Sequence, residues 1–167
     1  VYAATKRSCE LLCYTYHHLY GMRFRILRFF TVYGPWGRPD MSPFIFANNI
    51  VNKYPINVYN KGEMMRDFTY IDDIVDGFLE AIKKPFDFEI FNLGSGTPIK
   101  LMDYINLIEK NLGVETEKVF LDIQPGDMKD TWADISKAKK LLDYEPKFSI
   151  DQGLFKFVEW FKKYYKH

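Results

Sequence analysis

Tyr2 and Lys6 are the first residues of this chain whose types and spacing suggest chemistry, because they lie four positions apart in a segment with helical character. On a helix, side chains at this spacing project from the same face. A free tyrosine titrates near ~10, too high for a general base at neutral pH, whereas a cation beside the phenol favours the phenolate. Such a phenolate could take a proton from a sugar hydroxyl while hydride leaves the same carbon. The pair alone is weak evidence, since any helix rich in Tyr and Lys produces one.

The composition is that of a globular domain rather than of a nucleic-acid-binding or disordered chain. Hydrophobic residues make up 47% and charged residues 27% of 167 residues, a length that fits one domain or about half of a two-domain enzyme. Lys and Arg total 23 against 22 Asp and Glu, so no basic excess is present to neutralise a phosphate backbone. Aromatic residues are enriched at 18%, and a surplus of Tyr also suits a site that stacks flat ligands.

Neither the cysteines nor the histidines form a pattern that predicts a disulfide or a metal site. Cys9 and Cys13 are expected to be small buried residues, because side chains four apart on a helix are poorly placed to bridge. His17, His18 and His167 lack Cys or carboxylate partners at metal-binding spacing. No apolar run approaches the ~18–20 residues of a membrane span, and no signal-peptide pattern opens the chain. We therefore expect a cytoplasmic protein with no membrane partner.

Helices and strands are expected to alternate along the chain, which indicates the α/β class. Helices are predicted over residues 3–20, 42–53, 72–84, 100–112, 136–142 and 149–165. Short strands are predicted over residues 24–30, 57–59, 66–70, 89–93 and 119–123. Asp72 is the expected N-cap of its helix, and Gly34 to Asp40 is expected to be a loop because of its Gly and Pro content. The chain opens at Val1 with a helix already under way, so we expect a fragment whose N-terminal part is absent.

Five ordered blocks add specificity to the Tyr–Lys pair. They are YAATK at 2–6, RFFTVYGP at 28–35, RDFTYIDD at 66–73, FNLGSG at 91–96, and GD at 126–127 with AD at 133–134. In this order and spacing they resemble the extended short-chain dehydrogenase/reductase family of NAD-dependent nucleotide-sugar epimerases and dehydratases, over essentially the whole chain. Within that family, the run at 28–41 is most similar to that of the members that epimerise UDP-glucuronate at C4.

The resemblance implies catalytic and cofactor roles at three positions. Tyr2 would be the catalytic acid/base. Lys6 would hold the nicotinamide ribose of NAD and, with the positive charge of the cofactor, lower the pKa of Tyr2. Phe29 sits where the backbone of family members touches the nicotinamide end, so Tyr2, Lys6 and Phe29 are the expected cofactor-binding residues.

Substrate-binding positions follow from the same resemblance. Thr31 falls where galactose-type epimerases usually carry Asn and would line the sugar–diphosphate site, and Tyr59 would stack on the uracil. Arg66 would bind the diphosphate and Asp127 the uridine ribose. Gln124 departs from an arginine that some epimerases use for phosphate, which would leave the diphosphate more dependent on Arg66.

Arg38 is the most informative candidate for the choice of sugar. A uronic acid carries a carboxylate, and a guanidinium pairs with a carboxylate in a bidentate fashion. Arg38 lies in the Gly/Pro-rich loop near the expected sugar pocket, so we expect it to bind that carboxylate. An ordinary solvated loop arginine is the alternative.

The expected architecture is the C-terminal half of an extended short-chain dehydrogenase fold, namely the end of the Rossmann domain plus the substrate-binding domain. Residues 1–167 would carry the catalytic helix and the nucleotide-sugar-binding portion. The family binds NAD on a Gly-rich turn that opens a helix, and no such unit occurs in this sequence. The N-terminal NAD-binding half is therefore expected to be missing, and the chain alone is expected to be inactive.

The main hypothesis is an isomerase that interconverts UDP-glucuronate and UDP-galacturonate by oxidation and re-reduction at C4. A nucleotide-sugar 4,6-dehydratase and a non-catalytic sugar-nucleotide-binding or dimerisation module remain open as alternatives. The resemblance also implies a homodimer, with residues 3–20 and either 42–53 or 72–84 at the interface. No nucleic-acid partner is expected.

Overall fold

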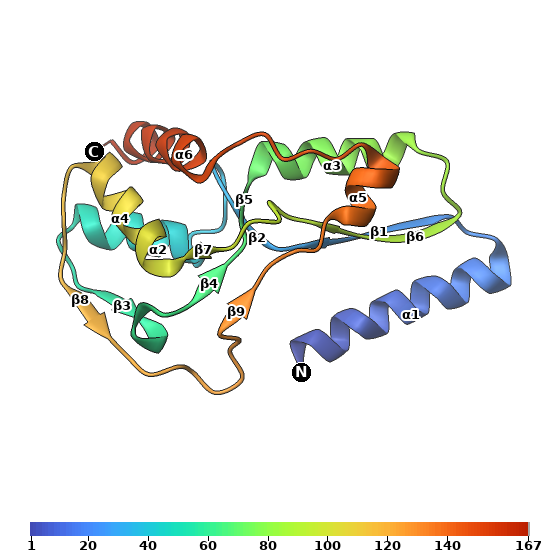
Figure 1. Cartoon of the computed structure of the whole chain (residues 1–167), viewed down its shortest axis with the longest axis horizontal. Helices are drawn as coiled ribbons and strands as arrows, with labels where there is room; N and C mark the ends of the chain where they lie inside the picture. Colours follow the sequence, from blue (N-terminus) through green and yellow to red (C-terminus); the bar gives the residue numbers. More distant parts are fainter. Residues whose placement is uncertain (167) are drawn as a thin grey trace.

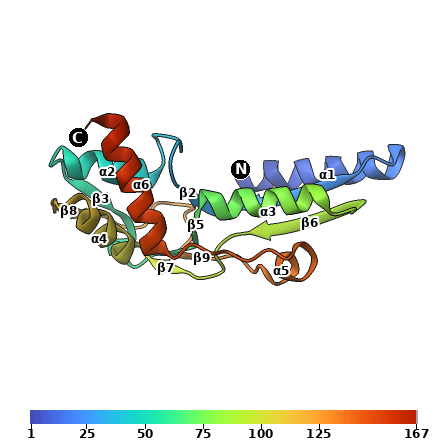
Figure 2. The same cartoon turned by 90° about the horizontal axis from the view of Figure 1, so that it is seen from above.

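The computed structural model describes residues 1–166 and shows an elongated α/β chain with two ends of different character (Figures 1 and 2). One end contains helix α1 (Tyr2–Tyr20) and two long strands, β1 (Phe24–Phe29) and β6 (Phe88–Leu93). The other end contains helices α2 (Ser42–Val51), α4 (Leu101–Leu112) and α6 (Ile150–Tyr165). His167 lies outside the described residues.

Strands β1 and β6 form a parallel ribbon between helices. They pair in register from Phe24 opposite Phe88 to Phe29 opposite Leu93. Helices α3 (Ile71–Lys83) and α1 lie on opposite sides of this ribbon (Figure 1). Strand β6, α3 and α5 (Ser136–Leu142) enclose one hydrophobic core, which explains why these strands are rich in apolar residues.

A second core lies between α2, α4 and α6. Its fully buried side chains come from these helices and from neighbouring strands; they include Ile50, Ile56, Tyr104, Ile105, Leu154 and Phe157. Helix α6 begins with a capping box, in which the Ser149 side chain accepts from the Gln152 backbone N–H and the Gln152 side chain accepts from the Ser149 backbone N–H. The cap fixes the point where the chain turns back onto this core.

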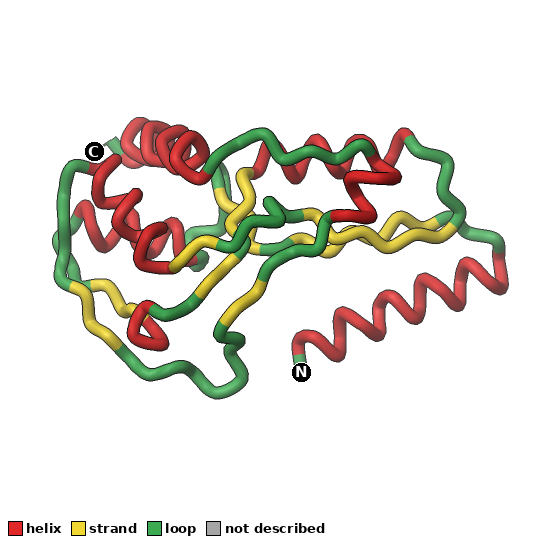
Figure 3. Tube along the Cα trace, viewed as in Figure 1, coloured by secondary structure: helices red, strands yellow, loops and turns green. Residues whose placement is uncertain are grey.

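Short strands connect the two ends (Figure 3). β2 (Thr31–Tyr33) pairs in parallel with β5 (Phe68–Tyr70), and β3 (Ile56–Val58) pairs in parallel with β8 (Lys118–Phe120). β4 (Met65–Arg66) lies between β7 (Ile99–Lys100) and β9 (Asp130–Thr131). A 3-10 turn, η1 (Tyr59–Gly62), follows β3.

The strand predicted over residues 66–70 is divided at Asp67. β4 and β5 belong to different sheets, and the Asp67 side chain lies fully buried between them. Three backbone N–H groups and the Thr69 hydroxyl donate to its carboxylate, so the residue links loops instead of continuing a strand.

Two local predictions were wrong. Asp72 is not the N-cap of α3: the helix begins at Ile71 with Tyr70 as its N-cap. Asp72 lies in the first turn, where its negative charge interacts favourably with the helix dipole. Cys9 is exposed and Cys13 is half-buried, both as free thiols, because Glu10 is the one buried residue within the described helix α1. Helix α1 contacts the ribbon through the Glu10–Arg28 pair and through the rings of Tyr14 and His17, whose centres lie 5.5 and 5.4 Å from that of Phe88.

Within residues 1–166, none of the helices has the length and apolar character needed to cross a membrane. The same residues contain no cluster of three or more His, Cys, Asp or Glu side chains placed to hold a metal ion.

Candidate active site

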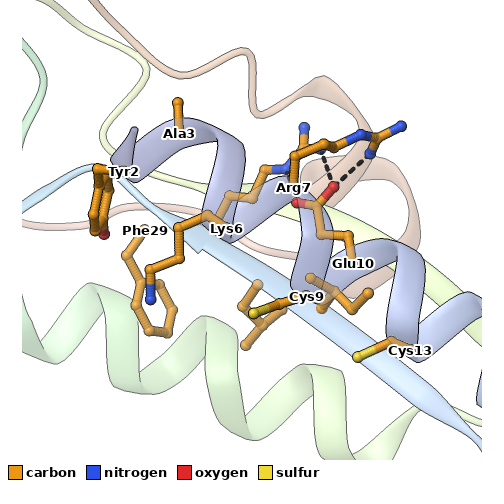
Figure 4. Close-up of a pocket in the computed structure, with 11 residues that line it drawn as sticks. Tyr2, Ala3, Lys6, Arg7, Cys9, Glu10, Cys13 and Phe29 are labelled. Carbon is orange, nitrogen blue, oxygen red and sulfur yellow. Dashed lines mark hydrogen bonds and ion pairs between the residues drawn. The ribbon is translucent and has the colours of Figure 1, made fainter.

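Tyr2 and Lys6 lie in the first two turns of α1 and extend to the same side of it (Figure 4). The Lys6 ammonium nitrogen is 5.5 Å from the centre of the Tyr2 ring. Both side chains line a cavity of about 510 Å³ between α1 and β1, together with Phe29 at the end of β1. The structure thus brings the three predicted cofactor-binding residues to one place and holds a cation beside the phenol.

A buried carboxylate fixes α1 against β1 next to this cavity. Glu10 accepts two hydrogen bonds from Arg28, at 2.6 Å from Nε and 2.7 Å from Nη2, and a further one from Arg7 (Figure 4). The hydrogen bonds from Arg28 lower the pKa of Glu10 to about 2, against the opposing effect of desolvation. Because Arg28 directly precedes Phe29, this pairing fixes where Tyr2 and Lys6 stand relative to the end of β1.

A second cavity, of about 220 Å³, gathers four of the predicted substrate-binding residues. Thr31 comes from β2, Tyr59 from η1, Arg66 from β4, and Asp127 from the loop before β9. Its other lining residues are Ser42, Phe46, Asn57, Met64, Phe68 and Leu101. An aromatic ring, a guanidinium, a carboxylate and hydroxyls on one wall can bind a base, a phosphate and a ribose.

Arg66 is tied to the loop that supplies Asp127. Its Nη2 donates to Asp127 Oδ1 at 3.0 Å and to the Met128 carbonyl at 2.6 Å, and its Nη1 donates to the Lys129 carbonyl at 2.8 Å. The Arg66 side chain is only 16% exposed. The guanidinium is therefore held in one orientation at the cavity wall.

Asp67 supports this wall from behind. Its Oδ1 accepts from the Ser95 N–H at 2.8 Å and the Thr69 hydroxyl at 2.9 Å, and its Oδ2 accepts from the N–H groups of Gly96 at 2.9 Å and Ala133 at 3.0 Å. A side chain at Gly94 would meet this carboxylate at 2.8 Å, so the loop passes it closely only because that residue has none. The bonds join the residue after Arg66 to the segment that follows β9.

Arg38 lies outside both cavities, on the exposed loop between β2 and α2. Its guanidinium forms a bidentate ion pair with the Asp40 carboxylate, in which Nε donates to Oδ1 at 3.0 Å and Nη2 donates to Oδ2. The hydrogen bonds that Arg38 donates to the Asp40 carboxylate raise the pKa of Arg38.

Some contributors to the site were not predicted. Ser42 and Asn57 line the second cavity, and Glu10 anchors the Tyr–Lys helix. Glu10 carried a signal in the sequence, since a carboxylate four residues after Lys6 falls on the same helical face. Gln124 is exposed, and its backbone carbonyl accepts from the Asp127 N–H at 3.1 Å.

The parallel ribbon between helices, the Tyr–Lys helix and the polar cavity at the far end define the C-terminal half of an extended short-chain dehydrogenase/reductase fold. The model of the NAD dependent epimerase/dehydratase family matches residues 1–94, and the chain belongs to that family.

Curated relatives are similar to nearly the whole of this chain. The chain is 58% identical over 161 residues to the uncharacterized protein MJ1055 of Methanocaldococcus jannaschii, covering 96% of this chain and 49% of the relative. It is 50% identical over 163 residues to a UDP-glucuronate 4-epimerase of Thermodesulfobacterium geofontis, covering 97% of this chain and 50% of that protein. The chain thus spans about half the length of the curated relatives it matches.

A solved structure confirms the fold. The UDP-glucuronic acid 4-epimerase of Bacillus cereus, in complex with UDP-glucuronic acid and NAD, superposes with a TM-score of 0.92 at 38% identity. The match covers 98% of this chain and 53% of that one. The fold expected from the sequence is therefore confirmed, including its correspondence to one half of the enzyme.

Proposed function

We propose that this chain is the catalytic and sugar-nucleotide-binding portion of an NAD-dependent UDP-glucuronate 4-epimerase, which interconverts UDP-glucuronate and UDP-galacturonate. The observation that carries the proposal is geometric: Tyr2, Lys6 and Phe29 line one cavity, and Thr31, Tyr59, Arg66 and Asp127 line a second, with the Arg38 loop directly following the strand that carries Thr31. A sugar whose C4 hydroxyl meets Tyr2 carries its C6 substituent close by, and a guanidinium there selects a carboxylate. The cavity around Arg66 and Asp127 would take the UDP end.

Tyr2, Lys6 and Phe29 fit the nicotinamide ribose end of NAD. The Lys6 ammonium offers three donors and no acceptor, and the Tyr2 hydroxyl is beside it, which matches the vicinal hydroxyls of a ribose. When bound, NAD supplies a hydride acceptor and donor at the sugar C4. The rest of the cofactor would be held outside residues 1–167, because the chain spans about half the length of the curated relatives it matches.

The proton step belongs to Tyr2. In the proposed reaction its phenolate oxygen accepts the proton of the C4 hydroxyl while the C4 hydrogen leaves as hydride, so a 4-keto sugar forms. After the sugar has turned over, the same oxygen would return the proton to the C4 oxygen while hydride returns to the opposite face of C4. Lys6, whose ammonium nitrogen is 5.5 Å from the centre of the Tyr2 ring, would hold the nicotinamide ribose beside the phenolic oxygen.

Arg38 would exchange one carboxylate for another. In the structure the Asp40 carboxylate accepts hydrogen bonds from both Nε and Nη2 of Arg38, and both side chains are largely exposed. An exposed ion pair contributes little to stability, so the carboxylate of a uronate can displace Asp40 at small cost.

The test is an assay of the full-length protein, expressed from the coding region with its upstream codons, on UDP-glucuronate without added NAD. We expect UDP-galacturonate to form, because hydride returns to the sugar and tightly held NAD is not consumed. Elimination of water from the sugar would instead identify a dehydratase, and no product at all would contradict the proposal. Arg38→Ala should raise the KM for UDP-glucuronate far more than that for UDP-glucose; equal effects would contradict the carboxylate assignment.

We also propose that the full-length protein is a homodimer that uses α1. The helix leaves Leu11, Leu12 and Leu19 exposed, and such side chains are normally covered. Light scattering of the full-length protein should give twice the monomer mass. A Leu12→Glu variant should shift that mass toward the monomer.

A further inference from the structure

The loop that carries Arg38 is held by an aromatic clamp that the proposed reaction does not use. Trp36 lies two residues before Arg38 and is 74% exposed, yet its ring lies against helix α6. Its ring centre is 5.3 Å from that of Trp160 and 5.1 Å from that of Tyr164, in edge-to-face geometry at 60° and 76°. Trp160 and Tyr164 stack on each other at 5.2 Å. The loop is thus bound to a helix more than a hundred residues later in the chain.

The backbone of Trp36 makes this contact unusual. Its φ is +62°, in the left-handed region that a bulky residue other than glycine seldom adopts. Such a conformation persists where surrounding contacts over-determine it, and it is found preferentially beside functional sites. The rings of Trp160 and Tyr164 are the contacts that can hold it.

The loop backbone next to Arg38 is also held in place, by the ring of Phe44 and by helix α2. A Cβ on Gly37 would come within 2.7 Å of the Phe44 ring, so the loop backbone lies directly against that ring. Phe44 in turn meets Trp160 edge to face at 5.7 Å. The Met41 N–H donates to the Arg38 carbonyl at 3.1 Å and closes the turn onto α2.

We propose that Trp36, clamped by Trp160 and Tyr164, is a positioning residue that presents Arg38 to the carboxylate of the substrate. The inference rests on the proposed role of Arg38, and it identifies the contact that holds the Arg38 loop in its binding conformation. Without the clamp, Arg38 keeps its charge, but part of the binding free energy is then lost in ordering the loop. The UDP end, held in the cavity of Arg66, is not affected by that cost.

The experiment compares two probes, UDP-glucuronate and UDP, by calorimetric titration of the full-length protein. Trp160→Leu should raise the Kd for UDP-glucuronate by up to about tenfold, the size expected when a side chain and its loop must be ordered on binding, and leave that for UDP within about twofold. Tyr164→Leu, which removes an exposed ring and spares the core, should act in the same direction. Trp160→Phe should restore most of the affinity, and Phe155→Leu, an exposed position on the same helix, should change neither Kd.

The remaining variants separate this inference from the proposed function. Arg38→Ala should give the same selective loss, and the double variant with Trp160→Leu should lose no more than either change alone, because both act through one contact. If Arg38→Ala is selective but neither Trp160→Leu nor Tyr164→Leu is, the clamp does not position Arg38. A rise in both Kd values would also overturn it, in favour of a general structural role. If Arg38→Ala leaves UDP-glucuronate binding unchanged, the carboxylate assignment fails, and the positioning role fails with it.

Discussion

The Arg66 guanidinium and the Asp127 carboxylate meet at 3.0 Å although they are 61 positions apart, and both line the cavity proposed for UDP. Arg66 also donates to the carbonyls of Met128 and Lys129, so it holds the loop that carries its partner. The side chain that we propose as the phosphate ligand is therefore also the one that anchors the loop. Replacing it removes both functions, whereas replacing Asp127 leaves the loop attached.

Arg66→Lys should weaken UDP binding more than Asp127→Asn. Lysine keeps the charge, but its single ammonium group cannot bond two carbonyls and a phosphate at once as the planar guanidinium can. We therefore expect the Kd for UDP to rise at least about tenfold, the effect of losing one charge-assisted hydrogen bond. Asp127→Asn keeps one acceptor oxygen and should cost less, about threefold. Calorimetric titration with UDP measures both. Gln124→Ala is the matched control on the same loop and should leave the Kd unchanged; equal losses for all three variants would contradict the assignment.

Tyr2→Phe should stop turnover without weakening binding. Removing the phenolic oxygen removes the group that accepts and returns the C4 proton, and general acid–base catalysis of this kind contributes ~10²–10⁴-fold. We expect kcat on UDP-glucuronate to fall by about that factor, while the Kd stays within about twofold. Tyr16→Phe, on the same helix but away from the cavity, should keep full activity. A Tyr2→Phe variant with ordinary kcat would remove Tyr2 from the mechanism.

Glu10 should make the attachment of α1 sensitive to acid. Its hydrogen bonds from Arg28 lower its pKa from 4.5 to about 2 in the folded state, so its stabilisation is complete above the unfolded-state pKa and is lost as the pH falls through about 2. Because both arginines are partly exposed, we expect a contribution of about 1–2 kcal/mol at pH 7. Glu10→Gln should lower the free energy of unfolding by that amount at pH 7.

The pH dependence distinguishes this effect from a simple packing defect. In urea denaturation from pH 7 to 2.5, the difference between the unmodified protein and Glu10→Gln should shrink as the pH falls. Glu80→Gln, which removes a helix-surface pair with Lys83, should change stability by less than about 0.5 kcal/mol. A difference for Glu10→Gln that does not vary with pH would contradict the electrostatic explanation.

Local patterns predicted α3, α4 and α6 well because apolar residues recur along one face of each of these helices. The 136–142 prediction is confirmed at both ends, and Gly113 ends α4 in the left-handed conformation. Four substrate positions carried over from the family motifs lie around one cavity, as expected for motifs that occur in order.

Long-range arrangements were not predictable in the same way. The division of the 66–70 strand depends on donors from Ser95, Gly96 and Ala133, which no local window contains. The clamp on the Arg38 loop joins Trp36 to Trp160, and a high aromatic content does not say which rings meet. The burial expected for Cys9 was wrong because helical spacing gives a face but not what covers it.

Asp67→Asn should destabilise the fold and loosen the wall behind Arg66. The amide would place an NH₂ group where the carboxylate now faces N–H donors, so at least one buried backbone donor would lose its acceptor, at a cost of about 3 kcal/mol. Urea denaturation measures the change in the free energy of unfolding. Asp87→Asn, an exposed residue paired with Arg23, is the control and should cost less than about 0.5 kcal/mol. Similar values for the two variants would show that the Asp67 network carries no special stability.

Gly153→Ala should destabilise the protein even though alanine is the better helix former by ~1 kcal/mol. A Cβ at this position of α6 would lie 2.0 Å from the Tyr33 hydroxyl and 2.8 Å from its Cζ. Tyr33 is buried and packed edge to face against Tyr70 and Tyr104, so it cannot move aside freely. We expect a net loss of about 2 kcal/mol in the free energy of unfolding, the usual size for an overpacked core.

The Tyr33 hydroxyl provides the control for that clash. Tyr33→Phe removes the atom that the new methyl group would strike, so the double variant with Gly153→Ala should recover about half of the loss in urea denaturation. Additive losses in the double variant, or a Gly153→Ala protein as stable as the original, would show that α6 shifts to accept the methyl group. In that case α6 could pack against β2, the strand that leads to the Arg38 loop, even with a side chain at residue 153. Glycine would then not be required for this close packing.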